Sequence, residues 1–231
     1  MANLREIILD TESTGLNYKQ GDRIIEIGCI EIVNKVRTNN YFHTYINPKK
    51  MISKGAYNVH GISNTFLKDK PLFCDIAKEF YEFIKDSRLV IHNAKFDIGF
   101  MNNEFQMIGM PKISMSNVVD TLLIARKKFP GAPANLNALC KRFNICLDTR
   151  DKHGALIDSE LLAMVYLALT SGQQTKLEFR ARNLDSNILN DVKDTFPKRN
   201  FGLTTIENNL HEKMLSSIPN SLWKKYRVVP K

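Results

Sequence analysis

The sequence predicts an α/β domain in which helices cover the faces of a mixed sheet, followed by a short helical C-terminal extension. Short β-branched runs come first along the chain, and they then alternate with segments of helical apolar spacing. The chain has 231 residues, of which 43% are hydrophobic. This is enough for one ordinary domain with its own core and an additional segment.

Four short apolar runs are expected to form strands. The first two, at 7–9 and 24–33, are separated by a glycine-bearing polar stretch at 11–22, and they predict a hairpin of central strands. Residues 40–46 alternate between apolar and polar side chains, which predicts a third strand. The run at 89–91 is too short to be a helix and predicts a fourth.

Three segments have the spacing of an amphipathic helix. Apolar side chains recur every three or four residues at 73–85 and at 95–107. The segment 154–170 has the strongest pattern of this kind, with an apolar face that runs from Leu161 to Leu169. These helices are expected to cover the sheet.

Beyond these helices the chain is predicted to form a linker and two further amphipathic helices. The linker is expected at 173–180, and it begins with a polar stretch. Pro197 must end the first helix, and Thr204 with Glu207 has the spacing of a capping box that begins the second. The apolar residues that recur at helical spacing are Leu184, Ile188 and Val192 in the first helix, and Ile206, Leu210 and Met214 in the second.

Composition and charge narrow the class of protein. The formal net charge of +9 suggests a polyanionic partner without identifying it. No apolar run approaches the roughly 18 residues of a membrane helix, and the N-terminus has no apolar signal segment. We expect a soluble, cytoplasmic protein. Four cysteines without Cys-x-x-Cys spacing are expected to be reduced core residues: Cys29, Cys74, Cys140 and Cys146.

Asp10 and Glu12 end the first apolar strand. Because side chains on a strand alternate between its faces, the two carboxylates project to the same side. In isolation this tripeptide would be a polar junction between a strand and a turn. The small residues at 13–15 that follow let a ligand approach the backbone, which favours a binding site.

Two further acids, Asp97 and Asp158, lie on the apolar faces of predicted helices. Helical projection places Asp97 in line with Met101, and Asp158 in line with Leu161 and Leu162. An acid near a helix N-terminus is also favoured by the helix dipole alone. A carboxylate that points toward a core must, however, be paired, protonated or bound to metal. Two such acids are hard to explain as solvated surface.

Together these four carboxylates form an oxygen-donor set without a matching His or Cys cluster, which suits Mg²⁺ or Mn²⁺ and not Zn²⁺. The set fits a two-metal phosphodiester site, with ions about 3.5–4 Å apart that activate a water and stabilise the leaving 3′ oxygen. His153 stands five residues before Asp158. In isolation it would be a helix-entry residue, but beside two cations its imidazole is suited to take the proton of that water.

Three segments resemble the motifs of the DEDDh family of 3′→5′ exonucleases. These segments are 8–16, 92–100 and 153–158, and they occur in the family's order. His153 is separated from Asp158 by four residues, which matches the histidine-bearing variant of the family. The similarity covers residues 4–179. Within the family, the sequences at 153–156 and 165–168 are most similar to the proofreading epsilon subunits of bacterial DNA polymerase III.

The resemblance implies a ribonuclease-H-like fold with a five-stranded mixed sheet. It implies metal ligation by the four carboxylates and general-base catalysis by His153. The residues that it places around the terminal nucleotide are Asp10, Glu12, Leu16, Val59, His60, Phe96 and Asp158. Without the family, 59–62 would be a turn before a helix. Asp120 and Thr121 are also similar to the family, but we prefer to interpret them as a helix cap.

The implied function is removal of mismatched 3′-terminal nucleotides from DNA, by an exonuclease domain at 1–172 that proofreads for the replicative polymerase. The segment 181–231 resembles the tail that binds the polymerase alpha subunit, although Trp223 could instead fold back on the core. In the linker, Gln174, Leu177 and Phe179 resemble a sliding-clamp-binding peptide. Leu177 and Phe179 could instead cap the core.

Two other functions stay open. A free-standing RNA or single-strand exonuclease of the same fold would use the same residues, but it would not need the C-terminal extension. A catalytically silent module that only holds DNA or a polymerase would not need all five catalytic side chains.

Overall fold

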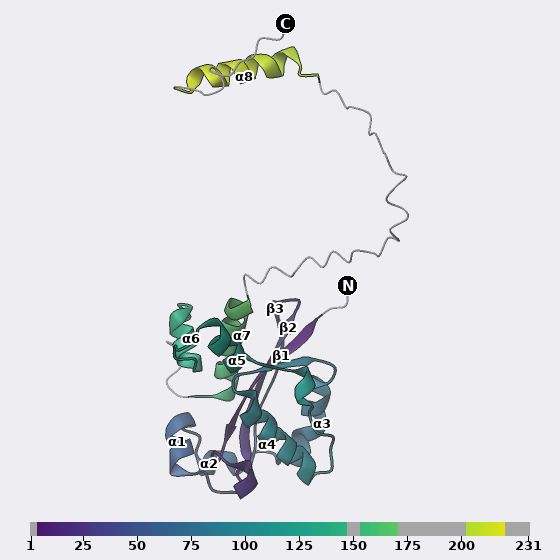
Figure 1. Ribbon diagram of the computed structural model, residues 1–231. Helices are drawn as coiled ribbons and strands as arrows, with labels where there is room; N and C mark the ends of the chain where they lie inside the picture. The colour runs from purple at the N-terminus through teal and green to yellow at the C-terminus, as the bar shows by residue number, and fades with distance from the viewer. Residues whose placement is uncertain (1–3, 147–152, 171–201, 220–231) are drawn as a thin grey trace, which may run out of the picture. The chain divides into compact units, whose positions relative to one another are not determined.

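A computed structural model of the chain describes residues 4–146, 153–170 and 202–219. The chain divides into two compact units, Met1–Lys176 and Leu177–Lys231. The first unit contains the sheet and most of the helices, and the second contributes one described helix (Figure 1).

Five strands form the predicted mixed sheet, in the order β3-β2-β1-β4-β5. Antiparallel pairing joins β1 to β2 and β2 to β3, and parallel pairing joins β1 to β4 and β4 to β5. The predicted hairpin is confirmed, with β1 at the centre of the sheet. The strands are β1 Arg5–Ser13, β2 Ile24–Val33, β3 Val36–Tyr45, β4 Arg88–Ile91 and β5 Val118–Asp120.

The three predicted helices of the first unit are α3, α4 and α7, and each observed end lies within one residue of the prediction. Four short helices that the apolar spacing did not predict are α1, α2, α5 and α6. The helical elements are η1 Tyr18–Gln20, α1 Lys54–His60, α2 Asn64–Leu67, α3 Phe73–Ile84, α4 Ala94–Met107, η2 Met115–Asn117, α5 Thr121–Lys128, α6 Leu136–Arg142, α7 Ala155–Thr170 and α8 Thr205–Ser217.

The sheet separates two helical layers (Figure 1). Ile7 and Leu9 of β1 point to the face covered by α3 and α4, where they join a cluster with Phe80 and Phe105. Ile8 points to the opposite face and packs in a cluster with Leu162 of α7. By the same alternation, Asp10 and Glu12 project to the face that α7 covers.

The two layers are fixed to the sheet by polar contacts as well as by apolar packing. The guanidinium of Arg23 forms two hydrogen bonds with the buried carboxylate of Glu104, at 2.7 and 2.6 Å, which hold α4 to the start of β2. Tyr166 of α7 donates to the buried Glu6 at 2.7 Å. Buried charges that are paired in this way fix the register of helix on sheet.

In the second unit, α8 begins at the predicted capping box. The Thr204 hydroxyl accepts from the backbone N–H of Glu207, and the Glu207 carboxylate accepts from that of Thr204. The apolar side chains of this helix are exposed: Ile206, Leu210 and Met214. The first predicted C-terminal helix, the linker and Trp223 lie outside the described residues. No described helix is both long and apolar enough to cross a membrane.

The expectation that all four cysteines are buried was wrong for two of them. Cys29 and Cys140 are buried, whereas Cys74 and Cys146 are exposed, and all four are free thiols. Cys74 is in the first turn of α3, where apolar neighbours in sequence point to a different face of the helix. Local apolar composition therefore does not decide which face of a helix a cysteine occupies.

Candidate active site

The C-terminal end of β1 brings two carboxylates to the edge of the sheet where β4 and β5 also end. Asp10 stands opposite Gly28 of β2, and Glu12 stands opposite Glu26. Both acids are partly buried. Burial and the negative charges of Asp97, Glu12, Asp158 and Glu26 raise the pKa of Asp10 well above its usual value.

Asp97 reaches this edge from the first turn of α4. Its side chain is 3% exposed, and it accepts a hydrogen bond of 2.7 Å from the Thr11 hydroxyl. Burial raises the pKa of Asp97 to about 7, although the hydrogen bond from Thr11 opposes the shift. The predicted inward orientation is confirmed. Burial thus disfavours the charged form of this carboxylate, which a bound cation would stabilise.

Asp120 fixes the position at which α4 begins. Its carboxylate accepts from the backbone N–H groups of Asn93 and Ala94, both at 3.2 Å, and from that of Leu122 at 2.9 Å. Asn93 has a left-handed backbone (φ 66°), which turns the chain from β4 into the helix. The predicted helix cap is therefore confirmed for α5, and the same carboxylate also binds the entry of α4.

The first turn of α7 supplies Asp158, and His153 precedes this helix. Nδ1 of His153 lies 3.0 Å from Oδ2 of Asp158, whose side chain is almost wholly buried, while the imidazole is partly exposed. The potential ligand atoms of Glu12, His153 and Asp158 all lie within 4.8 Å of one another. An Nδ1–H that donates to Asp158 leaves Nε2 as the basic nitrogen.

The residues expected to line the terminal nucleotide come from three segments. The backbone N–H of His153 donates to the carbonyl of Val59 at 3.3 Å, so the end of α1 lies beside the entry of α7. Ser53 N–H donates to the Thr14 carbonyl at 2.9 Å, which joins α1 to the turn that carries Leu16. Leu16 is 85% exposed, Val59 is half-exposed, Phe96 is partly buried and His60 is buried.

Oxygen donors dominate this cluster, and the charges of these acids are close together. A pair of divalent cations would offset their mutual repulsion and the burial of Asp97, so the residues fit the expected metals. Exposed acidic groups are common without a metal. Here the imidazole of His153 and the raised pKa values of Asp10 and Asp97 distinguish the cluster from a solvated acidic surface.

Four supporting residues were not identified from the sequence as part of the site: Thr11, Glu26, Gly28 and Asp120. Two of them carry a local signal. Gly28 interrupts a β-branched strand, which is a sign of close backbone approach, and Glu26 is an acid inside the same apolar run. Glu26 is 2% exposed, and its Oε1 lies 2.8 Å from Nε2 of His43. Thr11 carries no such signal, because its partner is distant in the sequence.

Comparisons with known proteins agree with this geometry. The family model described as Exonuclease (RNase_T) matches residues 7–166. The DNA polymerase III subunit epsilon of Rickettsia felis is 49% identical over 225 residues, which cover 94% of this chain and 98% of the relative. The same subunit of Escherichia coli is 48% identical over 176 residues, which cover 73% of this chain and 72% of the relative.

Solved structures show the same fold. Exonuclease X in complex with 5′ overhanging duplex DNA has a TM-score of 0.56 and 27% identity, covering 72% of this chain and 90% of that chain. Exonuclease I has a TM-score of 0.65 at 16% identity, covering 74% and 41% of the two chains, which is a likeness of fold alone. The predicted ribonuclease-H-like architecture is thus confirmed. The chain belongs to the exonuclease family and, within it, to the DNA polymerase III epsilon subunits.

Proposed function

We propose that this protein is a 3′→5′ exodeoxyribonuclease that removes mismatched 3′-terminal nucleotides from DNA as the proofreading subunit of the replicative polymerase. The observation that supports this most strongly is the convergence of Glu12, His153 and Asp158 within 4.8 Å, in a chain of the exonuclease family. The family uses divalent metal ions. In this chain we assign them as two Mg²⁺ or Mn²⁺ ions, held by Asp10, Glu12, Asp97 and Asp158.

Residues of this chain have separate roles in the hydrolysis. When bound, the two cations would lower the pKa of the attacking water and stabilise the leaving 3′ oxygen. His153 takes the proton of that water on Nε2, because its Nδ1 faces Asp158. Asp158 orients the ring and stabilises the imidazolium that forms. Thr11 holds the carboxylate of Asp97 in place through its 2.7 Å hydrogen bond.

The terminal nucleotide is held beside these groups by Leu16, Val59, His60 and Phe96. The exposed side chains of Leu16 and Val59 offer apolar surface that a base or sugar would cover. Nδ1 of His60 accepts from the backbone N–H of Ile62 at 3.0 Å, which fixes the orientation of the ring. A site of this kind recognises the end of a strand without selecting one base.

The C-terminal residues are assigned to partners. We place the polymerase alpha subunit on 181–231 and the sliding clamp on 174–179, with 173–180 as a linker and 1–172 as the exonuclease domain. The exposed apolar side chains of α8 support a protein partner for this segment. The names of the relatives, DNA polymerase III subunit epsilon, support a polymerase as that partner.

The experiment that tests this function compares 3′ ends. The purified protein is incubated with Mg²⁺ and one of three 5′-labelled substrates. Two are DNA primers on a DNA template, with a paired or a mismatched 3′ end, and the third is an RNA strand. We expect faster release from the mismatched DNA end, because unpairing a mismatched nucleotide costs less. Equal rates on paired and mismatched ends would argue against proofreading, and a preference for RNA would favour the free-standing RNA exonuclease.

A further inference from the structure

We propose that two adjoining cavities beside His153 form a trough that binds the phosphate backbone of the strand leading to the 3′ terminus. This inference rests on the proposed function, because it adds to the catalytic site a surface for the nucleotides that precede the terminal one. The trough is defined by Lys141, Asn137 and Asn135 next to His153, and by Arg126 and His92 beyond them.

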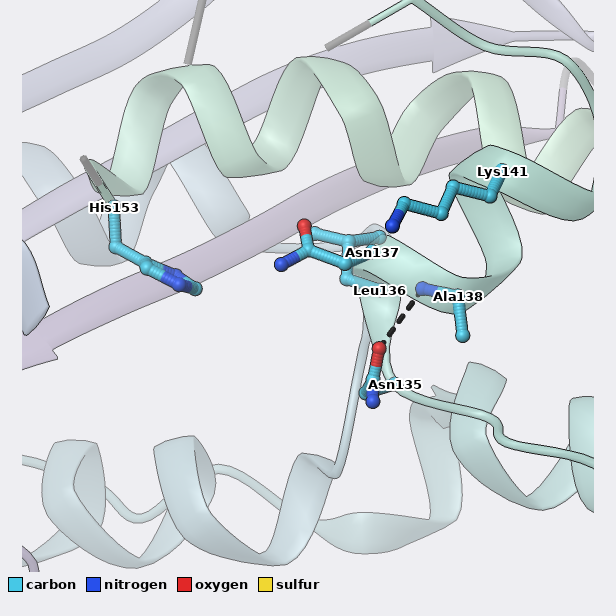
Figure 2. A pocket seen from close by; sticks show the side chains of 6 residues that line it. All are labelled: Asn135, Leu136, Asn137, Ala138, Lys141 and His153. Carbon is cyan, nitrogen blue, oxygen red and sulfur yellow. Dashed lines mark hydrogen bonds between the residues drawn. The ribbon is translucent and has the colours of Figure 1, made fainter. Parts of the chain in front are cut away.

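The first cavity has a volume of about 480 Å³ and opens at the general base (Figure 2). The imidazole of His153 points into it from one side, and the side chains of Asn137 and Lys141 lie on the other. Because the scissile phosphate must lie next to His153, the preceding nucleotides have to leave from this point. The cavity lined by His153 opens at this point.

The second cavity continues this path. It has a volume of about 490 Å³, and its lining includes His92, Asn93 and Arg126. Asn135 lines both cavities, so they lie next to each other on either side of this residue. Each volume is within the range of about 300–1,000 Å³ that is typical of ligand sites. Together they provide room for more than one nucleotide.

The charge of the trough suits a polyanion. Among the described residues, no Asp or Glu lines either cavity, whereas Lys141 and Arg126 bring one positive charge to each. Both side chains are exposed, and no salt bridge between described residues involves them. By contrast, the neighbouring Lys128 donates to the carbonyl of Leu169 at 2.9 Å. Arg126 and Lys141 are therefore available for phosphate groups.

The lining also indicates which part of the strand is bound. Within the described part of the chain, neither cavity is lined by Phe, Tyr or Trp, on which bases would stack. Cationic and amide side chains instead match the sugar-phosphate backbone, which carries no sequence information. Backbone binding would let the enzyme accept any terminal mismatch.

The test compares two double variants with the wild-type chain. Arg126→Gln/Lys141→Gln removes the two charges of the trough. Lys112→Gln/Lys127→Gln removes two exposed charges that line neither cavity. Binding of a 5′-fluorescent oligothymidine of about eight nucleotides is measured by anisotropy with Ca²⁺, and turnover with Mg²⁺ is measured on this strand and on the p-nitrophenyl ester of thymidine 5′-monophosphate.

For the trough variant we expect the Kd for the oligonucleotide to rise on the order of tenfold or more, and the slope of log Kd against log salt to fall by about 1.4, since each lost phosphate contact is worth about 0.7 on a single strand. Its loss of turnover should be much larger on the oligonucleotide than on the ester, which has no preceding strand. The control variant should bind and cleave like the wild type.

An oligonucleotide Kd within twofold of the wild-type value, or an equal loss in the control variant, would overturn the trough. So would equal losses of turnover on the two substrates. If the wild-type chain cleaves neither substrate, the proposed function fails, and the anisotropy measurement still decides whether the trough binds the strand.

Discussion

Gly28 of β2 and Ala155 of α7 approach so closely that no side chain fits between them. A Cβ atom at Gly28 would overlap the backbone of Ala155 and Leu156. The hydroxyl of Ser159 donates to the Gly28 carbonyl at 2.8 Å and fixes the same contact. Because Asp158 follows Ala155 by one helical turn, this approach sets the distance between Asp158 and the carboxylates of β1.

Gly28→Ala should therefore reduce activity without changing any proposed metal ligand. The added methyl has to push α7 away from the sheet, which we expect to cost about 1–3 kcal/mol of stability and to separate Asp158 from Glu12. Thermal unfolding and the rate of nucleotide release measure both effects. Gly55→Ala is the matched control, because a Cβ at Gly55 meets nothing within 4 Å. Full activity of Gly28→Ala would show that α7 is not positioned by this contact.

His153→Ala should lower the rate of nucleotide release about 10²–10⁴-fold, which is the usual contribution of a positioned general base. Binding of Mn²⁺, measured by calorimetry, should change much less than the rate. His211→Ala provides the control, since His211 is exposed on α8. A rate loss below about tenfold would mean that His153 is only a residue at the entry of the helix.

Without metal, the stability of the protein should fall as pH rises from about 4 to 7. Asp97 has a pKa of about 7 in the folded protein against 3.8 when unperturbed, so between these values the folded state binds the proton more tightly. The stability gained at low pH is lost as pH rises through the folded pKa. Asp97→Asn keeps an acceptor for Thr11 and should reduce this dependence, while the raised pKa of Asp10 leaves a part of the same sign. Melting curves in EDTA with the same slope for both proteins would contradict the pKa of Asp97.

The parts of the fold that the sequence predicts are those with a long apolar period. Helices α3, α4 and α7 are 12 to 16 residues long, so the spacing of their apolar side chains is clear, although α7 packs both against the sheet and against α5 and α6. The four short helices span 4 to 8 residues, and β5 has 3. Segments of this length cannot show a period, and their positions depend on tertiary contacts.

The same distinction applies to the site. Asp97 and Asp158 were predictable because an acid on an apolar face breaks the pattern of a helix. Thr11 was not, because its partner Asp97 is 86 residues away and a threonine in a strand is ordinary. The second role of Asp120, at the start of α4, likewise follows only from the parallel pairing of β4 with β5.

Changing Leu177 and Phe179 to Ala should abolish a weak, direct contact with the sliding clamp while exonuclease activity on free DNA persists. In an extended peptide these side chains share one face and would enter an apolar pocket of the clamp. Both residues lie outside the described part of the chain. Clamp binding by the purified protein is measured with and without the changes. Equal binding would remove the clamp as a partner, and lost nuclease activity would mean that the two residues pack on the core.

The most direct test of the catalytic site is the pattern of products from a 5′-labelled single-stranded DNA, with Mg²⁺ or with EDTA, for the wild-type chain and for Asp97→Ala and Asp158→Ala. We predict a ladder that shortens by one nucleotide at a time from the 3′ end, only with the wild-type chain and only with Mg²⁺. Both variants should keep their melting temperature without metal, because each loses one repelling charge. Near-normal Mg²⁺-dependent release by either variant, or release by the wild-type chain in EDTA, would contradict the two-metal site.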